Sequence, residues 1–138
     1  MKVGIIGLGR MGEGMSRRML KEGIETYGYR RNYAKACEAA DSGYITAAAD
    51  SLESLVQVVK SDGVPGIFQL VIPAELVEDT INDLLPLLGP GDIVIDHGNS
   101  NFKDSRRRAE YLADLGIEYI DCGTSGGVYG LDRGYCLM

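Results

Sequence analysis

The chain has 138 residues and a formal net charge of −6, and this acidic balance excludes the broad basic surface that nucleic-acid binding requires. Its composition is 45% hydrophobic and 25% charged, with no apolar run of membrane-spanning length and no signal peptide, so we expect a globular cytoplasmic protein without a membrane partner. Its three cysteines form no C-x-x-C pair, which predicts reduced thiols and no metal site.

Strand-like and helix-like segments alternate along the chain, the pattern of a mainly parallel sheet with helices on both faces. We therefore expect a doubly wound α/β fold of the Rossmann type, in one NAD(P)-binding domain over residues 1–138. Strands are expected near residues 2–7, 24–29, 43–46, 66–72, 92–96 and 117–121, with a further strand beginning at 134. Helices are expected near residues 10–22, 32–41, 51–61, 75–87 and 102–115.

The first strand runs directly into the glycine-rich turn Gly7-Leu8-Gly9-Arg10-Met11-Gly12, which fits the pattern G-x-G-x-x-G. In this pattern the first glycine permits a tight turn, the second lets a diphosphate approach the backbone, and the third lets helix and strand pack closely. The N–H groups at the start of the helix then face the phosphates. Because the flanking strands and helix are those that the motif requires, it predicts dinucleotide binding rather than an ordinary tight turn.

The second strand ends in Tyr29-Arg30-Arg31-Asn32, about 20 positions past the glycine turn, where the adenosine ribose of a dinucleotide binds. A carboxylate here would accept hydrogen bonds from the free 2′-OH of NAD, whereas a guanidinium donates to the 2′-phosphate of NADP. Arg30 and Arg31 therefore predict NADP, with NAD as the alternative. Lys35, one helical turn further on, either adds to this positive patch or is an ordinary solvated helix residue.

The fourth strand is expected to end in Val71-Ile72-Pro73, which either line the ligand crevice at the carboxyl edge of the sheet or only terminate the strand. The fifth strand is followed by short polar residues at the same edge. Among them Asn99 both donates and accepts hydrogen bonds, so it can bridge cofactor and substrate. A helix-capping role for Asn99 or Ser100 fits equally well. We interpret His97, the only histidine, as incidental to the chemistry of the site rather than as a proton shuttle.

Two later segments have the composition of anion sites. The run Arg106-Arg107-Arg108 lies in an expected helix, where consecutive residues fan out around the axis, so we interpret it as a solvated face. After the sixth strand, Ser125, Gly126 and Gly127 expose consecutive backbone N–H groups. Such a nest binds a carboxylate or phosphate oxygen, with a flexible glycine turn as the alternative.

With these motifs the chain resembles the N-terminal part of the decarboxylating 6-phosphogluconate dehydrogenases, within the wider β-hydroxyacid dehydrogenase group. The resemblance covers essentially all 138 residues. It rests on GLGRMG at Gly7–Gly12, on DHGNS at Asp96–Ser100 followed by FKDS and an arginine-rich helix, and on DCGTSGGVYGLDRGYCLM at Asp121–Met138. The last segment is highly specific, because other hydroxyacid dehydrogenases share only its Ser-Gly-Gly core. The chain departs from the family where His97 replaces a usual second glycine and Tyr129 a usual tryptophan.

The resemblance implies oxidation of 6-phosphogluconate at C3 by NADP or NAD, loss of CO2 and release of ribulose 5-phosphate, a reaction of the pentose phosphate pathway and of gluconate utilisation. It also implies that Asn99 touches both cofactor and substrate, and that Ser125, Gly126 and Gly127 hold the substrate. The cofactor-binding residues that it implies are Gly7, Leu8, Gly9, Arg10, Met11, Gly12, Arg30, Arg31, Asn32, Val71, Ile72, Pro73 and Asn99.

The family's general-base lysine and general-acid glutamate have no counterpart in this sequence, and neither has the long helical domain that closes the site and forms the dimer. We therefore expect a truncated chain without catalytic residues that binds cofactor but is inactive alone, and a full-length enzyme that forms a homo-oligomer through the helical domain. Two other functions stay open: a dehydrogenase for another β-hydroxyacid, and a non-catalytic NADP-binding module.

Overall fold

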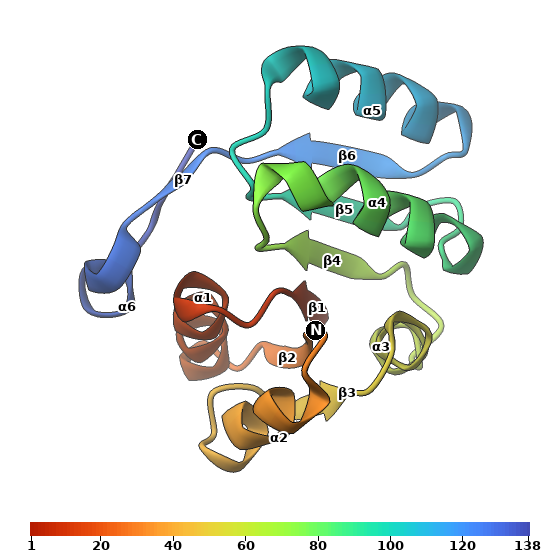
Figure 1. Ribbon diagram of the computed structural model, residues 1–138. Coiled ribbons are helices and arrows are strands. Elements are labelled where there is room, and N and C mark those ends of the chain that lie inside the picture. Colours follow the sequence, from red (N-terminus) through yellow and green to blue (C-terminus); the bar gives the residue numbers. More distant parts are fainter.

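The computed structural model describes the backbone of residues 1–138 and every side chain except that of Val128; in it, six parallel strands form one sheet (Figure 1). The strand order is β3-β2-β1-β4-β5-β6, so the direction of winding reverses between β1 and β4. This order confirms the predicted doubly wound, Rossmann-type α/β fold. The strands are β1 (Lys2–Ile6), β2 (Glu25–Tyr29), β3 (Ala47–Ala49), β4 (Ile67–Leu70), β5 (Ile93–Asp96) and β6 (Glu118–Asp121).

Helices cover the sheet in two layers, and Figure 1 shows α1 and α3 on opposite sides of β1 and β2. Side chains of α1 and α2 pack on one face of the sheet, while those of α3, α4 and α5 pack on the other. The helices are α1 (Arg10–Lys21), α2 (Tyr33–Asp41), α3 (Leu52–Val59), α4 (Ala74–Leu84), continued by the 3-10 turn Leu85–Leu87, and α5 (Phe102–Asp114).

Alternation along the strands divides the core between the two faces. Val3 and Ile5 belong to the cluster under α1 and α2, whereas Ile6, Phe68 and Leu70 belong to the cluster under α3 to α5. All five are at most 3% exposed. Because full burial of one such side chain stabilises the fold by about 1.5–3 kcal/mol, these clusters hold both helix layers against the sheet.

Polar side chains set the starts of three helices. Ser51 forms a capping box with Ser54 at the start of α3, and the Asn32 side chain accepts a hydrogen bond from a backbone N–H of α2. At α5 the cap is Asn101, whose Oδ1 accepts from the N–H of Lys103 at 3.0 Å. The alternative that Asn99 or Ser100 caps this helix is therefore wrong, because α5 begins at Phe102, one residue after Asn101.

The strand expected at residues 43–46 is also wrong, since β3 comprises Ala47–Ala49. Tyr44 instead closes the end of α2 by donating its N–H to a carbonyl of that helix, and Ile45, at 2% exposed, fills the core. Pairing with β2 begins only at Thr46. The β-prone side chains here serve the helix end and the core, and tertiary pairing places the strand on the alanines that follow.

After β6 the chain forms an antiparallel hairpin of β7 (Thr124–Ser125) and β8 (Cys136–Leu137), joined by the 3-10 turn Gly127–Tyr129 and the short helix α6 (Gly130–Arg133). The strand expected from residue 134 is thus present as the two-residue β8, whereas α6 was not predicted. Figure 1 shows this segment beside α1. The contact is close, because a Cβ on Gly14 of α1 would lie 2.1 Å from the hydroxyl oxygen of Tyr135.

Candidate dinucleotide-binding site

A cleft of about 440 Å³ opens at the carboxyl edge of the sheet, between the loops that follow β1, β2 and β4. It lies where the winding of the sheet reverses, which is the place where open α/β sheets bind ligands. Its volume falls in the usual range of ligand pockets, about 300–1,000 Å³. The site residues predicted from the sequence that line it are Gly7, Leu8, Gly9, Arg30, Arg31, Asn32, Val71, Ile72 and Pro73.

The three glycines of the turn differ in what a side chain would meet. Gly7 has a φ of 101°, and a Cβ there would lie 2.3 Å from the carbonyl oxygen of Val71. A Cβ on Gly12 would lie 2.0 Å from the carbonyl oxygen of Gly7. At Gly9, by contrast, a Cβ meets nothing within 4 Å. Gly7 and Gly12 are thus needed by the fold itself, while Gly9 leaves space above the backbone that a diphosphate fits.

The start of α1 faces the glycine turn without a capping side chain. Gly9, which lines the cleft, is the N-cap of this helix. The predicted cofactor residues Arg10, Met11 and Gly12 form its first turn and are not among the residues that line the cleft. No side chain caps this helix or α4, in contrast to α2, α3 and α5. The N–H groups of the first turn, at the positive end of the helix dipole, are therefore left for a ligand.

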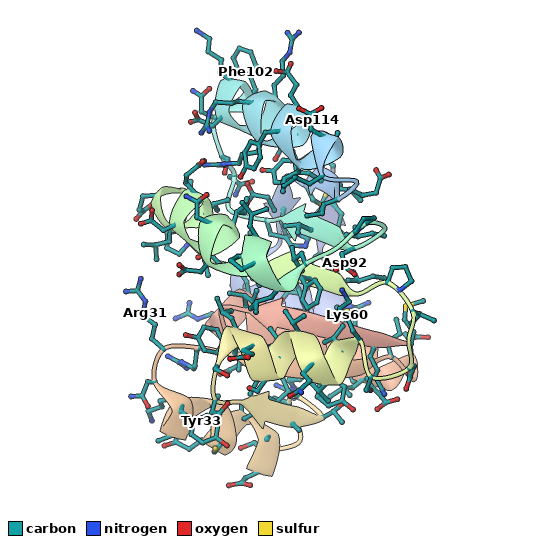
Figure 2. All side chains as sticks on the ribbon, turned by 90° about the vertical axis from the view of Figure 1, so that its right-hand side faces the viewer. Arg31, Tyr33, Lys60, Asp92, Phe102 and Asp114 are labelled. Atoms are coloured by element: carbon teal, nitrogen blue, oxygen red, sulfur yellow. The ribbon has the colours of Figure 1, made fainter. Side chains whose placement is uncertain are left out.

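A basic wall borders the cleft after β2. Arg30 lies over the glycine turn, where its Nη1 donates to the carbonyl oxygen of Leu8 at 3.0 Å. Arg31 is exposed and extends from the loop after β2 into the open space between α2 and α4 in the view of Figure 2. Lys35 points its charge elsewhere, because its Nζ pairs with Glu38 at 2.7 Å. The two adjacent arginines are thus the cations that the cleft presents.

Sequence reasoning missed the opposite wall of the cleft, which comes mostly from α4. Leu76, Thr80 and Asp83 recur at helical spacing, so they share the face of α4 that borders the cleft. The helical spacing of these three residues, in a helix that begins directly after Pro73, is the sequence signal that could have predicted them. The lining residues that were not predicted are Ile6, Tyr29, Leu52, Leu76, Asp79, Thr80 and Asp83.

Asn99 lies outside this cleft, in the loop after β5. Its φ of 54° is the one positive value at a non-glycine residue in the described backbone. Its Oδ1 accepts a hydrogen bond from the N–H of Thr124 at 3.2 Å. The next residue, Ser125, opens the turn in which Gly126 and Gly127 have φ values of 145° and 48°. The structure therefore brings Asn99 beside the predicted substrate-binding segment.

The loop after β4 connects these two regions. On one side the carbonyl oxygen of Val71 packs against Gly7 of the glycine turn. On the other side a Cβ on Gly98 would lie 3.0 Å from the carbonyl oxygen of Ile72. The loops that follow β1, β4 and β5 therefore form one continuous edge, from the cleft to Asn99.

The arginine run behind this edge is only partly solvated. The Arg106 side chain is 81% exposed, as predicted, but the Arg108 side chain is 5% exposed and pairs with Glu78 and Asp96. Side chains of consecutive helical residues point about 100° apart, so the three arginines spread over more than half of the helix circumference, and Arg108 is the one that faces the sheet. Hydrogen bonds and charge from Arg107 and Arg108 lower the pKa of Glu78 to about 2, against a desolvation that acts in the opposite direction.

His97 is not incidental. Its Nδ1 lies 2.7 Å from the Oγ1 of Thr124, which itself donates to the carbonyl oxygen of Cys122 at 2.9 Å. The Thr124 proton is thus already used, so His97 donates from Nδ1. Burial lowers the pKa of His97, although the charge of Asp96 acts in the opposite direction. A neutral imidazole therefore ties the loop after β5 to β7.

The described residues give no support to two other kinds of site. None of the helices in this part of the chain is both long and apolar enough to cross a bilayer. The same residues contain no cluster of three or more His, Cys, Asp or Glu side chains suited to a metal ion. Cys37, Cys122 and Cys136 are free thiols.

Comparison with known proteins agrees with this geometry. A 6-phosphogluconate dehydrogenase of Haloferax volcanii, NAD(+)-dependent and decarboxylating, is 40% identical over 138 residues, which cover 100% of this chain and 44% of the relative. The Plasmodium falciparum 6-phosphogluconate dehydrogenase, determined in its apo form and in complexes with its cofactor NADP+ and its substrate 6-phosphogluconate, superposes with a TM-score of 0.88 at 28% identity, over 100% of this chain and 30% of that one.

A 3-hydroxyisobutyrate dehydrogenase of Salmonella typhimurium also shares the fold, with a TM-score of 0.80 at 28% identity over 99% of this chain and 47% of that one. The chain spans less than half the length of the curated relatives it matches. The family profile described as the NAD binding domain of 6-phosphogluconate dehydrogenase matches residues 2–138. The chain therefore belongs to the family of NAD-binding domains of 6-phosphogluconate dehydrogenase.

Proposed function

We propose that this chain holds NADP in the cleft and serves as the cofactor-binding part of a decarboxylating 6-phosphogluconate dehydrogenase. The observation that carries the proposal is the open space at Gly9 in front of the uncapped start of α1. A diphosphate in that space receives N–H groups from the first turn of the helix and its positive dipole end. Leu52 and Leu76, on the walls of the same cleft, suit the apolar faces of an adenine.

The preference for NADP rests on Arg30 and Arg31. A 2′-phosphate is dianionic and accepts hydrogen bonds, so guanidinium groups bind it in a forked geometry. The free 2′-OH of NAD is best served by a carboxylate, and the residues directly after β2 supply none. The Haloferax volcanii relative is NAD(+)-dependent, so overall sequence similarity does not decide between NADP and NAD. The proposed preference therefore rests on Arg30 and Arg31.

The substrate is proposed to lie beyond the nicotinamide end of the coenzyme, between Asn99 and the segment Ser125–Gly127. Asn99 offers an amide, Ser125 a hydroxyl and the glycines backbone N–H groups, which together suit the carboxylate and hydroxyls of a sugar acid. In this chemistry, removal of hydride at C3 produces a β-keto acid. The ketone then accepts the electron pair that remains when CO2 leaves, which yields an enediol.

Two titrations of the chain test this function. NADP should bind with a lower Kd than NAD in a calorimetric titration, and 6-phosphogluconate added afterwards should shift the backbone NMR signals of Asn99 and Ser125–Gly127. Stronger shifts with 3-hydroxyisobutyrate than with 6-phosphogluconate would instead support another β-hydroxyacid as substrate. NADP binding without a response to either acid would support a non-catalytic module, and a preference for NAD would contradict the coenzyme assignment.

A further inference from the structure

A buried carboxylate holds the loop that carries Asn99. Asp96 is the last residue of β5 and is 0% exposed. Its Oδ1 accepts the N–H of Gly98 at 2.7 Å, and its Oδ2 accepts the hydroxyl of Ser100 at 2.6 Å. Gly98 and Ser100 are the two neighbours of Asn99. Both oxygens of one carboxylate therefore fix the backbone on either side of that residue.

Further donors surround Asp96 and hold its carboxylate in place. The Tyr119 hydroxyl donates to Oδ2 at 2.7 Å, and Nη1 of Arg108 lies 3.5 Å from the same oxygen. Arg108 also donates to the Ser100 hydroxyl at 3.0 Å and to Glu78 at 2.8 Å. A buried carboxylate is tolerated only when it is paired and hydrogen-bonded in this way. These groups come from α4, α5 and β6, so they tie the loop to the body of the domain.

Asn99 needs such support because of its own backbone. Asn99 has a φ of 54°, in the left-handed region that few non-glycine residues adopt, asparagine more readily than most. Such a conformation persists only where the surroundings impose it. Here Asp96 fixes the residues on both sides, while the Thr124 N–H engages the side-chain oxygen of Asn99 at 3.2 Å. The remaining amide NH2 is then the group that Asn99 presents to a ligand.

We propose that Asp96 is a positioning residue of the dinucleotide site: it sets the conformation in which Asn99 meets the nicotinamide end of the coenzyme. The inference rests on the proposed function of the cleft and extends it to a residue that contacts neither coenzyme nor substrate. Among the described residues, none of these hydrogen bonds reaches the proposed adenosine end of the site at the glycine turn, Arg30 and Arg31. Loss of Asp96 therefore weakens one end of the coenzyme only.

Asp96→Asn tests this with little change in shape. An amide has one acceptor oxygen, whereas the site needs two, so the NH2 group must face either the Gly98 N–H or the Ser100 hydroxyl. If the NH2 group faces Gly98, that N–H loses its acceptor. If it faces Ser100, a hydroxyl that already accepts from Arg108 must accept a second time instead of donating, so the hold on the Asn99 loop is weakened in either orientation. The readout is the ratio of the Kd for 2′,5′-ADP, which lacks the nicotinamide, to the Kd for NADP, both measured by calorimetry on the same preparation.

The chain supplies a matched control at the other end of β5. Asp92 is 1% exposed, accepts N–H groups of Gly66 and Gly89 at 2.7 and 2.8 Å, and pairs with Lys60 at 2.6 Å. Figure 2 shows Lys60 and Asp92 together, on the side of the molecule away from Arg31. Asp92→Asn makes the same chemical change at a similarly buried site, so it reproduces any general loss of stability without touching the Asn99 loop.

We expect Asp96→Asn to lower the Kd ratio about three- to tenfold, the size of one hydrogen bond, while the Kd for 2′,5′-ADP stays at the parent value. Asp92→Asn should leave the ratio unchanged. An unchanged ratio in Asp96→Asn, or an equal fall in both variants, would overturn the proposal. Should Asp96→Asn fail to fold, Ser100→Ala removes one of the same hydrogen bonds, and an unchanged ratio there overturns the proposal equally.

Titrations of the parent chain distinguish a failure of this inference from a failure of the proposed function. If the parent chain binds neither NADP nor 2′,5′-ADP, the proposed function itself is wrong. If the parent binds both with the same Kd, the coenzyme sits in the cleft but Asn99 makes no contact with its nicotinamide end, and only the role of Asp96 is refuted.

Discussion

Gly9→Ala separates ligand binding from folding at the centre of the site. Gly9 has φ −87° and ψ −171°, an extended conformation that alanine adopts without strain. The added methyl meets no protein atom within 4 Å. The variant should therefore fold as the parent does. The smaller freedom of its unfolded chain contributes about 0.4–1 kcal/mol, which is offset by the poorer N-cap that alanine makes for α1, so the free energy of unfolding should stay within about 1 kcal/mol of the parent value.

The same methyl group fills the space proposed for the diphosphate. If it displaces the diphosphate from one N–H of α1, the loss of a hydrogen bond to a charged group costs about 1.5–3 kcal/mol, or about a ten- to hundredfold rise in the Kd for NADP. Calorimetric titration measures the Kd, and urea unfolding measures the stability of the same sample. We expect weaker binding of NADP together with little change in stability.

Gly89→Ala is the matched control for this substitution. Its Cβ would meet only the Nζ of Lys60, at 3.9 Å, and Gly89 does not line the cleft. It should leave the Kd for NADP at the parent value. The reasoning about the glycine turn would be refuted if Gly9→Ala bound NADP as tightly as the parent and Gly89→Ala do.

Three further substitutions probe the fold and the charges around the cleft. Gly7→Ala places a side chain on a residue with left-handed backbone, which costs roughly 1–2 kcal/mol. Its Cβ would also overlap the Val71 carbonyl oxygen at 2.3 Å, so the free energy of unfolding should fall by more than this amount. Urea unfolding with parent-like stability would contradict this. Arg30→Asp should weaken NADP binding by about 1–3 kcal/mol in calorimetry. NAD binding should stay unchanged or become stronger, because the new carboxylate accepts a hydrogen bond from the free 2′-OH, and equal losses for both coenzymes would refute the role of Arg30 at the 2′-phosphate. Glu78→Gln should cost about 1–2 kcal/mol of stability at neutral pH, discounted for a partly exposed group. Because the pKa of Glu78 is lowered to about 2, its contribution is complete above the unfolded value of 4.5 and disappears as the pH falls toward 2, so urea unfolding curves of parent and variant should converge over that range.

The order of the strands and helices followed from local signals in the sequence. Gly7 to Gly12 and the apolar runs around them fix a strand, a turn and a helix at nearly the observed bounds, because each residue there has a local steric role. The third strand could not be found in this way. Its three alanines have no β preference, and only their pairing with β2 makes them a strand.

Site residues could be predicted where their position follows from the adjacent strand or turn. They could not be predicted where their position depends on packing between elements that are distant in the sequence. Arg30 and Arg31 follow β2 directly, so their place at the cleft could be read from the sequence. Arg108 pairs with Glu78 and Asp96 only because α4, α5 and β5 pack together, and nothing in the run of three arginines shows which one turns inward. The acidic side chains of α4 in the cleft depend on the same packing.

The most direct test of the central claim is a crystal structure of this chain grown with NADP. We expect the diphosphate above Gly9 at the start of α1, with the 2′-phosphate against Arg30 and Arg31. Density for the diphosphate away from the glycine turn, or a 2′-phosphate directed into solvent with neither arginine near it, would contradict the claim.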